Sequence, residues 1–421
     1  MMTRSPSITH NRLLLTIGAA LIPAATSLLH AQDAASELAG PDAVSSQLAA
    51  DEKDKPELLD VDLQNGFDSW KASVKERTGL DFGIDYFSLG LAATDSLGDS
   101  TAASGVFRVY GNWELFNRGK ENNGSLVFKV EHRHAYTAVA PAAFAGELGY
   151  AGLTSVGYSD QGWRATHLFW KQRFADGRGV SYIGFLDTTD YADVYTLASP
   201  WTGFANIAFQ NGSGAMGGIP DGALGAMVGG FLTDNLYLVG GIADANGDPT
   251  DLGDGFDSMF NDFETFKSLE FGWVSKQEDV FLNNAHVTLW QVDERSRAGT
   301  PDGWGISASI TKSTNNGFMP FLRGGWADDG GSFYEASVSA GFGYTPNPGQ
   351  SMLGLGLNWN RPNRSTFGPN LDDQYSLELF QQLQVTEGFE ITPSVQIIRN
   401  PALNPSDDWS IFFGLRLRAA L

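Results

Sequence analysis

The chain has 421 residues, among them 50 glycines, 28 phenylalanines, 11 tryptophans and no cysteine, and its formal net charge is −22. This acidity argues against nucleic acid or an anionic surface as a partner. The glycine and aromatic content is typical of a large curved sheet with aromatic interfaces, and disulfide bonds cannot stabilise the fold.

Residues 1–31 form a predicted secretory signal peptide. Arg4 and Arg12 give it a positive start, an apolar stretch follows, and Ala31 ends a cleavage-site pattern. Because Pro23 and several polar residues interrupt the apolar stretch, a retained anchor helix is disfavoured. No later segment is long and apolar enough for a spanning helix, so insertion in a membrane would require a closed barrel.

The next two segments precede the strand-like part of the sequence. Residues 32–65 are rich in Ala, Ser, Asp and Glu and contain few large apolar side chains, which predicts a flexible arm. A short helix is predicted over 66–79, with Asp68 as its N-cap and Gly79 at its end. We expect this helix to lead into the barrel or to plug its periplasmic end.

From residue 80 onward, apolar and polar residues alternate in many consecutive segments. Period two predicts strands with one apolar and one polar face. The predicted strands are 80–94, 105–116, 124–136, 164–175, 180–187, 223–232, 235–243, 266–275, 284–293, 303–313, 317–326, 332–344, 351–361, 374–386, 388–398 and 408–420, with one weaker candidate at 204–210. The expected fold is all-β: a transmembrane antiparallel up-and-down β-barrel of about 16 strands over residues 80–421, with a short N-terminal helix.

The least strand-like part of this region runs from residue 187 to 222. It carries Trp201 and Phe204, which are poorly suited to free exposure, so we expect it to fold into the lumen and narrow it. The links near 137–162, 244–262 and 362–373 are expected to face outward from the cell.

Three local patterns are weighed against simpler explanations. The GxGxxG pattern at 212–217 precedes Pro220, which cannot open a helix, so a loop is expected there instead of a dinucleotide site. His132 and His134 continue a lipid-side strand face, so a metal site at this pair is disfavoured. No cysteine nucleophile or GxSxG elbow is present, so neither an enzyme nor a cofactor is expected.

The acidic turn with Asp244, Asn246 and Asp248 resembles the start of a calcium loop. Its oxygen ligands at alternate positions suit a hard cation, but Pro249 stands where the EF-hand pattern needs glycine. An acidic external loop is expected, with weak Ca²⁺ binding as the alternative.

The polar strand faces supply candidates for the lumen. Arg108, Glu131, Arg133 and Lys171 lie on early, consecutive strands, which predicts one patch of wall with charges of both signs. Donors and acceptors together suit neutral solutes with many hydroxyls, and an aromatic ring can stack on a sugar. The constriction candidates are Arg108, Glu131, Arg133, Lys171, Asp187, Trp201 and Glu335.

Several segments resemble the carbohydrate-selective porins of the OprB type. They are the segment 392–405 (TPSVQIIRNPALNP), the final strand FGLRL at 413–417, the segment from Gly184 to Tyr191, the turn 244–247 and the helix before Gly79. The resemblance covers about residues 66–421. It implies a 16-stranded barrel in the outer membrane of a Gram-negative-type bacterium, passing monosaccharides and similar small neutral sugars by diffusion.

The chain also departs from that family. Lys71 and Ala72 stand where members often have Gly-Gly, and the chain ends on Leu421 instead of an aromatic residue. A general or cation-preferring pore, and a plugged barrel with a structural role at the surface, therefore stay open as alternatives. A homo-oligomer is compatible with all of them.

Overall fold

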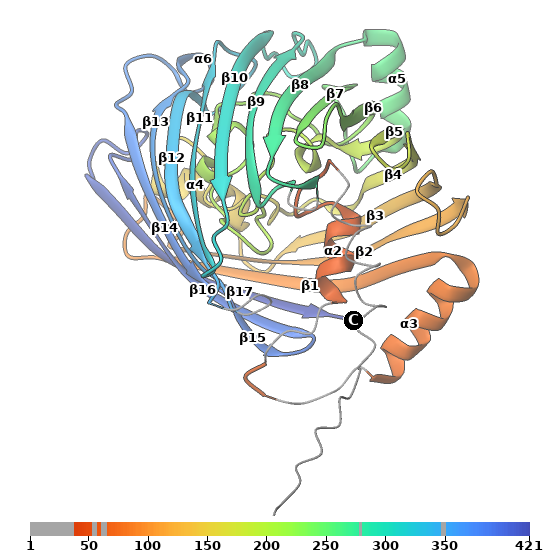
Figure 1. The fold of residues 1–421 in the computed structure, drawn as a ribbon. Coiled ribbons are helices and arrows are strands. Elements are labelled where there is room, and N and C mark those ends of the chain that lie inside the picture. Colours follow the sequence, from red (N-terminus) through yellow and green to blue (C-terminus); the bar gives the residue numbers. More distant parts are fainter. Residues whose placement is uncertain (1–37, 53–56, 60–64, 278–279, 347–350) are drawn as a thin grey trace, which may run out of the picture.

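The computed structural model describes residues 38–52, 57–59, 65–277, 280–346 and 351–421, and the predicted signal peptide lies outside them. The strands form one antiparallel sheet, in which sequence neighbours pair and β1 also pairs with β17, so that the barrel closes (Figure 1). The strands are β1 Leu80–Ala93, β2 Thr101–Phe116, β3 Gly124–Ala135, β4 Gly162–Phe174, β5 Gly179–Asp187, β6 Asp221–Phe231, β7 Leu236–Asp244, β8 Thr265–Val274, β9 Asn283–Val292, β10 Gly303–Lys312, β11 Phe318–Ala327, β12 Tyr334–Tyr344, β13 Leu353–Pro362, β14 Gln374–Gln381, β15 Leu383–Thr386, β16 Phe389–Arg399 and β17 Trp409–Ala420.

Two of these segments make up a single strand of the barrel. Both β14 and β15 pair with β16, and they are separated only at Gln382. The barrel therefore has 16 strands, which confirms the predicted fold class. The weak strand candidate at 204–210 is wrong: this segment lies off the sheet and contains a short 3₁₀ turn, Ile207–Phe209.

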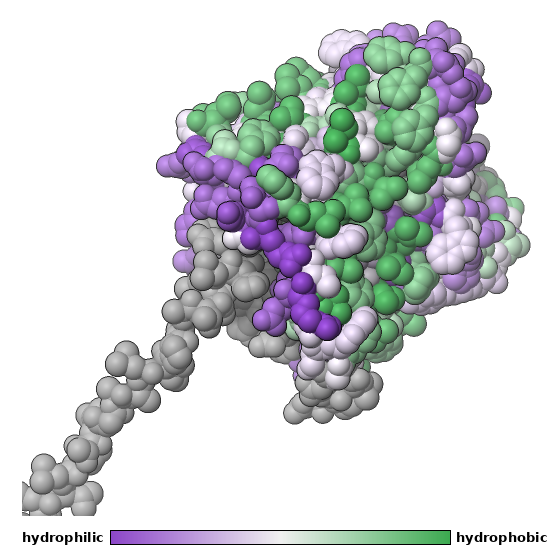
Figure 2. All heavy atoms as spheres, turned by 90° about the vertical axis from the view of Figure 1, so that its right-hand side faces the viewer, coloured by the Kyte–Doolittle hydropathy of each residue, from purple (hydrophilic) through white to green (hydrophobic). Residues whose placement is uncertain are grey.

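Side chains alternate across the wall as period two predicts. Apolar side chains such as Leu357, Leu415 and Ile310 are exposed on the outer surface. Figure 2 shows hydrophobic residues spread over much of the one face of the molecule that it displays. Large exposed aromatic side chains lie near the two ends of the strands, as in the aromatic girdles of membrane barrels. At one end they are Trp163, Trp304, Trp326 and Trp409, and at the other Trp113, Phe116, Phe174 and Trp273.

The two ends of the barrel differ in their connections. The end that holds the C-terminus and helix α3 has short links, here called the turn end, and the opposite end has long links, here called the loop end (Figure 1). At the turn end, Gly317 has φ +78°, and a Cβ there would collide with the Thr345 carbonyl, so glycine is required. The helices are α2 Val44–Asp51, α3 Asn65–Thr78, α4 Phe144–Leu148, α5 Leu252–Asp257 and α6 Arg364–Phe367. No helix within the described residues is long and apolar enough to cross a membrane.

The predicted helix over 66–79 corresponds to α3, which ends at Thr78 and is followed by Gly79 with φ +77°. It lies beside the start of β1 (Figure 1). There the Trp70 ring meets the Phe82 ring edge-on, with the ring centroids 5.7 Å apart. Phe82 alternates with the lumen-facing Asp85 and so lies on the outer side. The helix therefore packs at the rim of the turn end and does not plug the lumen.

The predicted flexible arm differs from what its composition suggests. Its described part, residues 38–52, lies inside the barrel and contains α2 (Figure 1). Val44, Gln47 and Leu48 are buried there, and the arm packs because the lumen supplies the apolar and charged partners that it lacks by itself. Farther along, the Leu58 and Leu59 amides donate to the backbone carbonyls of β15, at 3.2 and 2.9 Å.

Candidate functional site

A row of alternating charges crosses the lumen wall on four neighbouring strands. The register places Asp85 of β1 opposite Arg108 of β2, Arg108 opposite Glu131 of β3, and Glu131 opposite Arg164 of β4. All four side chains are buried inside the barrel. We call these four residues the charge row; it is held in place by the backbone ladder of the sheet itself.

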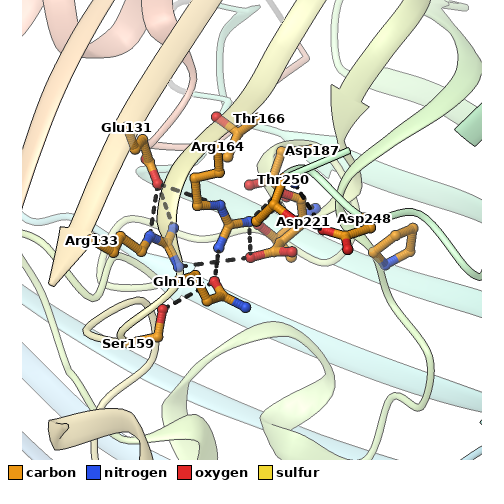
Figure 3. Close-up of polar contacts among 12 residues, drawn as sticks. Glu131, Arg133, Ser159, Gln161, Arg164, Thr166, Asp187, Asp221, Asp248 and Thr250 are labelled. Atoms are coloured by element: carbon orange, nitrogen blue, oxygen red, sulfur yellow. Dashed lines mark hydrogen bonds and ion pairs between the residues drawn. The ribbon is translucent and has the colours of Figure 1, made fainter. Parts of the chain in front are cut away.

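The arginines of this region are closely paired. Arg108 donates to both oxygens of Asp85, at 2.8 and 2.6 Å, and Arg133 donates through Nε to Glu131 Oε2 at 2.8 Å. Arg164 reaches Asp221 at 2.7 Å and Gln161 at 2.6 Å (Figure 3). These charge-assisted contacts fix the guanidinium groups, and the contact of Arg108 with both Asp85 oxygens also sets the plane of its guanidinium.

Residues 188–220, here called the lumen loop, connect β5 to β6 and fold into the barrel as predicted. Pro200 and Gly203 accept hydrogen bonds from Arg416 through their carbonyls, at 2.8 and 3.1 Å. The Ala205 and Asn206 amides donate to the Glu378 carboxylate, at 2.8 and 3.0 Å. The loop is therefore fixed to the wall beside the charge row, because these anchors lie on β17, which pairs with β1, and on nearby β14.

A second anchor of the lumen loop is Asp193, which pairs with Arg323 of β11 and with His286 of β9. Burial acts to raise the pKa of this carboxyl, but the Arg323 guanidinium and the His286 hydrogen bond outweigh it and hold the pKa below its ordinary value. The Asp193 amide also donates to Glu270 at 2.7 Å. The anchor therefore ties the loop to three strands through charged groups.

The lumen loop carries Trp201 to the charge row. Its ring centre lies 4.8 Å from the Arg108 guanidinium carbon and 5.6 Å from that of Arg133. Phe87 and Tyr158 contact the same ring, with centroids at 5.3 and 5.0 Å. The structure thus brings together four of the predicted constriction residues: Arg108, Glu131, Arg133 and Trp201.

Of the other predicted constriction residues, Lys171 and Glu335 lie apart from this group, and Asp187 lies near Arg164 of the charge row. Lys171 pairs in register with Ser125, six residues from Glu131 along β3, and so lies nearer the turn end; the prediction that it shares the patch of Arg108 is wrong. Glu335 lies at the loop end and pairs with Arg364, at 2.6 Å. Asp187 ends β5, close to the Arg164 group (Figure 3), and accepts hydrogen bonds from Thr189.

Arg164 is a lumen residue that strict alternation misses. Counting by twos from Lys171 puts residue 164 on the lipid side. A β-bulge at the Lys129/Val130 step of the β3–β4 pairing shifts the register, so that Arg164 and Lys171 both face inward. In the sequence of this strand, the shift is indicated by two consecutive polar residues, Thr166 and His167, between the inward-facing positions.

The calcium candidates do not converge on one point. Asp244 is bonded to Ser258 and to the Asn246 amide, while Asp248 accepts two hydrogen bonds from Thr250. Within the described ranges, no group of three or more His, Cys, Asp or Glu side chains is placed to hold a metal ion. His132 and His134 lie on the outer face as expected, where His132 meets the exposed Trp163 ring at 4.9 Å.

Several cavities touch α2, and two of them lie on different sides of it. One, of about 310 Å³, lies against Arg108, Trp201 and Arg418, and is here called the helix cavity. The other, of about 300 Å³, lies on the far side of α2 and includes Lys171 and Glu52 among its lining residues. Volumes of this order suit small-molecule ligands.

The geometry defines a class: a closed 16-stranded antiparallel barrel with a long loop folded into its lumen, which is the fold of porins. Residues 281–421 match the family model described as carbohydrate-selective porin, OprB family, which confirms the resemblance over the last third of the chain.

Solved structures agree on the fold. A high-pH structure of OprB from Pseudomonas putida aligns with a TM-score of 0.66 at 15% identity, covering 84% of this chain and 97% of that one. A low-pH structure of the same protein gives 0.51 at 13% identity, with coverages of 85% and 98%. No curated protein sequence matches the chain.

Proposed function

We propose that the protein is an outer-membrane porin through which small neutral carbohydrates diffuse, entering at the loop end and leaving at the turn end, which faces the periplasm. The single observation that carries this proposal is the meeting of Trp201 with the charge row inside a porin-type barrel. The family match over residues 281–421 supports the same solute class.

The chemistry of the constriction fits a sugar better than an ion. Carboxylates and guanidiniums alternate along the wall, so a passing hydroxyl group finds both an acceptor and a donor at each step. Because the opposite charges neutralise each other locally, neither a cation nor an anion gains a continuous path of one sign. Solute binding must stay weak, since a tight site would block release.

Specific observations also favour the second candidate, a plugged barrel. Helix α2 and the lumen loop both occupy the interior, and their largest side chains are buried. Planar-bilayer conductance separates the two candidates, because a plugged barrel gives no steady ionic current.

Liposome swelling tests the proposed solute class. Vesicles with the purified protein should swell in isotonic glucose, more slowly in disaccharides, and slowest in a charged solute of glucose size. Equal rates for neutral and charged solutes of one size would instead support a general diffusion pore. A swelling rate equal to that of protein-free vesicles would contradict both kinds of pore.

A further inference from the structure

The helix cavity has one wall that belongs to the N-terminal segment and not to the barrel. Asp42, Gln47 and Asp51 line it on one side, and Arg108, Trp201 and Arg418 line it on the other. We infer that this cavity is a binding site for a monosaccharide and that α2 supplies one of its walls. The inference rests on the proposed function. It adds that the segment with α2 makes the last contacts with the solute before release.

The groups around the cavity match the needs of a polyhydroxylated ligand. Asp42, Asp51 and Glu390 present carboxylate oxygens, and Arg108 and Arg418 present guanidinium N–H groups. The Trp201 ring lies at the same cavity, and the face of an indole can cover the C–H face of a sugar ring. Acidic and basic groups both line the cavity and nearly balance each other, which favours a neutral sugar over a charged derivative.

Two lining residues have hydrogen-bonding atoms to spare. Within the described part of the chain, neither the Gln47 Oε1 atom nor the Arg108 Nη1 atom has a hydrogen-bond partner, although both are buried. Buried polar atoms in folded proteins are nearly always paired, so one acceptor and one donor left over on two side chains that line one cavity are available to a ligand once those side chains turn toward it.

The helix is held firmly enough to act as a wall. Asp51 accepts a hydrogen bond from the Tyr110 hydroxyl at 2.6 Å and pairs with Arg418 at 2.8 Å. At the other end, the Gly40 amide donates to the Asp190 carbonyl at 2.6 Å, and Ser199 donates to Asp42 at 2.5 Å. Both ends of the segment are thus fixed, one to the barrel wall and one to the lumen loop.

The first test compares two faces of the same segment. Gln47→Leu keeps the side-chain size and removes the spare oxygen, together with the Nε2–H group that donates to the Asp42 carbonyl at 3.0 Å. Glucose-induced block of the ionic current should weaken about fivefold, the worth of the one hydrogen bond to the sugar. Glu52→Gln is the matched control, because Glu52 lies directly after α2 and pairs with Lys75 away from the helix cavity. This control should keep the wild-type block.

The outcomes separate the two proposals. If glucose blocked the current of Gln47→Leu as strongly as that of the wild type, the α2 site would be refuted, whereas the proposal of a sugar porin would stand. Absence of any glucose response in the wild type, despite steady current, would overturn the proposed function and the α2 site with it. A closed barrel migrates faster on a gel before heating than after heating, so this shift shows whether the barrel of each variant has closed.

A cross-link provides the second test and does not depend on Gln47. A Cβ placed on Gly40 would lie 3.0 Å from the Val194 Cβ, so Gly40→Cys with Val194→Cys can form a disulfide after a small shift. The chain has no other cysteine to interfere. If α2 is a wall, the oxidised protein should keep glucose block; loss of block on oxidation, restored by reduction, would show that α2 must leave for sugar to bind.

Discussion

Asp85 and Arg108 face each other directly across β1 and β2, and the guanidinium donates to both carboxylate oxygens, at 2.8 and 2.6 Å. The pair is not isolated, because Arg418 also reaches Asp85, at 3.1 Å. Arg108 further covers the Trp201 ring at 4.8 Å. One arginine therefore joins the barrel wall to the lumen loop.

Replacing Arg108 with Ala should lower both stability and sugar discrimination. Asp85 would keep Arg418 as a partner, so the loss should be about 1.5–3 kcal/mol, the worth of hydrogen bonds to a charged group. Urea unfolding would measure it. Sugar-induced current block should fall, while ionic conductance stays the same or rises. Arg361→Ala, which removes an exposed ion pair with Asp373, is the control and should change neither stability nor sugar discrimination. Equal effects of the two variants would contradict a special role for Arg108.

The inside–outside assignment of the wall can be tested at two nearby positions. Leu379 faces outward on β14, so Leu379→Arg should cost about 2–4 kcal/mol if it meets the middle of the bilayer. Gln382 lies in the same barrel strand and donates to Glu390 at 2.7 Å, so Gln382→Arg can pair with that carboxylate. Folding yield into detergent or lipid is the measurement, and similar yields for both variants would count against the assignment.

The regular part of the fold was open to prediction because lipid and lumen impose opposite chemistry on alternate residues. That rule places Arg108, Glu131 and Arg133 correctly. It fails for Arg164, because the bulge between β3 and β4 changes the alternation without any marked sequence signal. It also cannot tell how far along the barrel Lys171 lies, since that depends on strand register and not on parity.

The contents of the lumen were predictable only in part. An aromatic ring such as Trp201 in a long loop needs burial, and that need alone indicates an inward fold. The segment with α2 gives no such signal, because it is short of large apolar residues and its stability comes from partners on the wall. Asp51 finds Tyr110 and Arg418 only once the barrel has closed.

Trp201→Ala should loosen the lumen loop at its contact with the charge row. Loss of a buried tryptophan costs about 3–5 kcal/mol, and two guanidiniums would lose the ring that covers them. We expect higher ionic conductance, faster swelling with disaccharides and weaker glucose block. Trp201→Phe keeps a ring and should retain most of the wild-type behaviour. If Ala at this position left solute size selection unchanged, the constriction would lie elsewhere.

The last prediction concerns pH and Asp42, which lies before α2 and accepts a hydrogen bond from Ser199. Burial, followed by the nearby Asp190 carboxylate, raises the pKa of Asp42 from 3.8 to about 7, although Lys129 and Arg108 oppose the shift. Asp190 stays charged, because Lys129 and the His167 hydrogen bond outweigh burial and lower its pKa. Of the Asp42 and Asp190 carboxyl groups, Asp42 is thus the one that changes charge near neutral pH.

A group whose pKa is higher when docked takes up a proton on docking, so docking of α2 should be weakest above pH 7, strengthen as the pH falls through 7, and level off near pH 4. We therefore expect larger conductance fluctuations at pH 8 than at pH 5. Asp42→Asn mimics the protonated form and should behave at both pH values as the wild type does at pH 5. A pH response that persists unchanged in Asp42→Asn would assign the effect to another group, and His167, bonded to Asp190 at 2.7 Å, is the one to replace next.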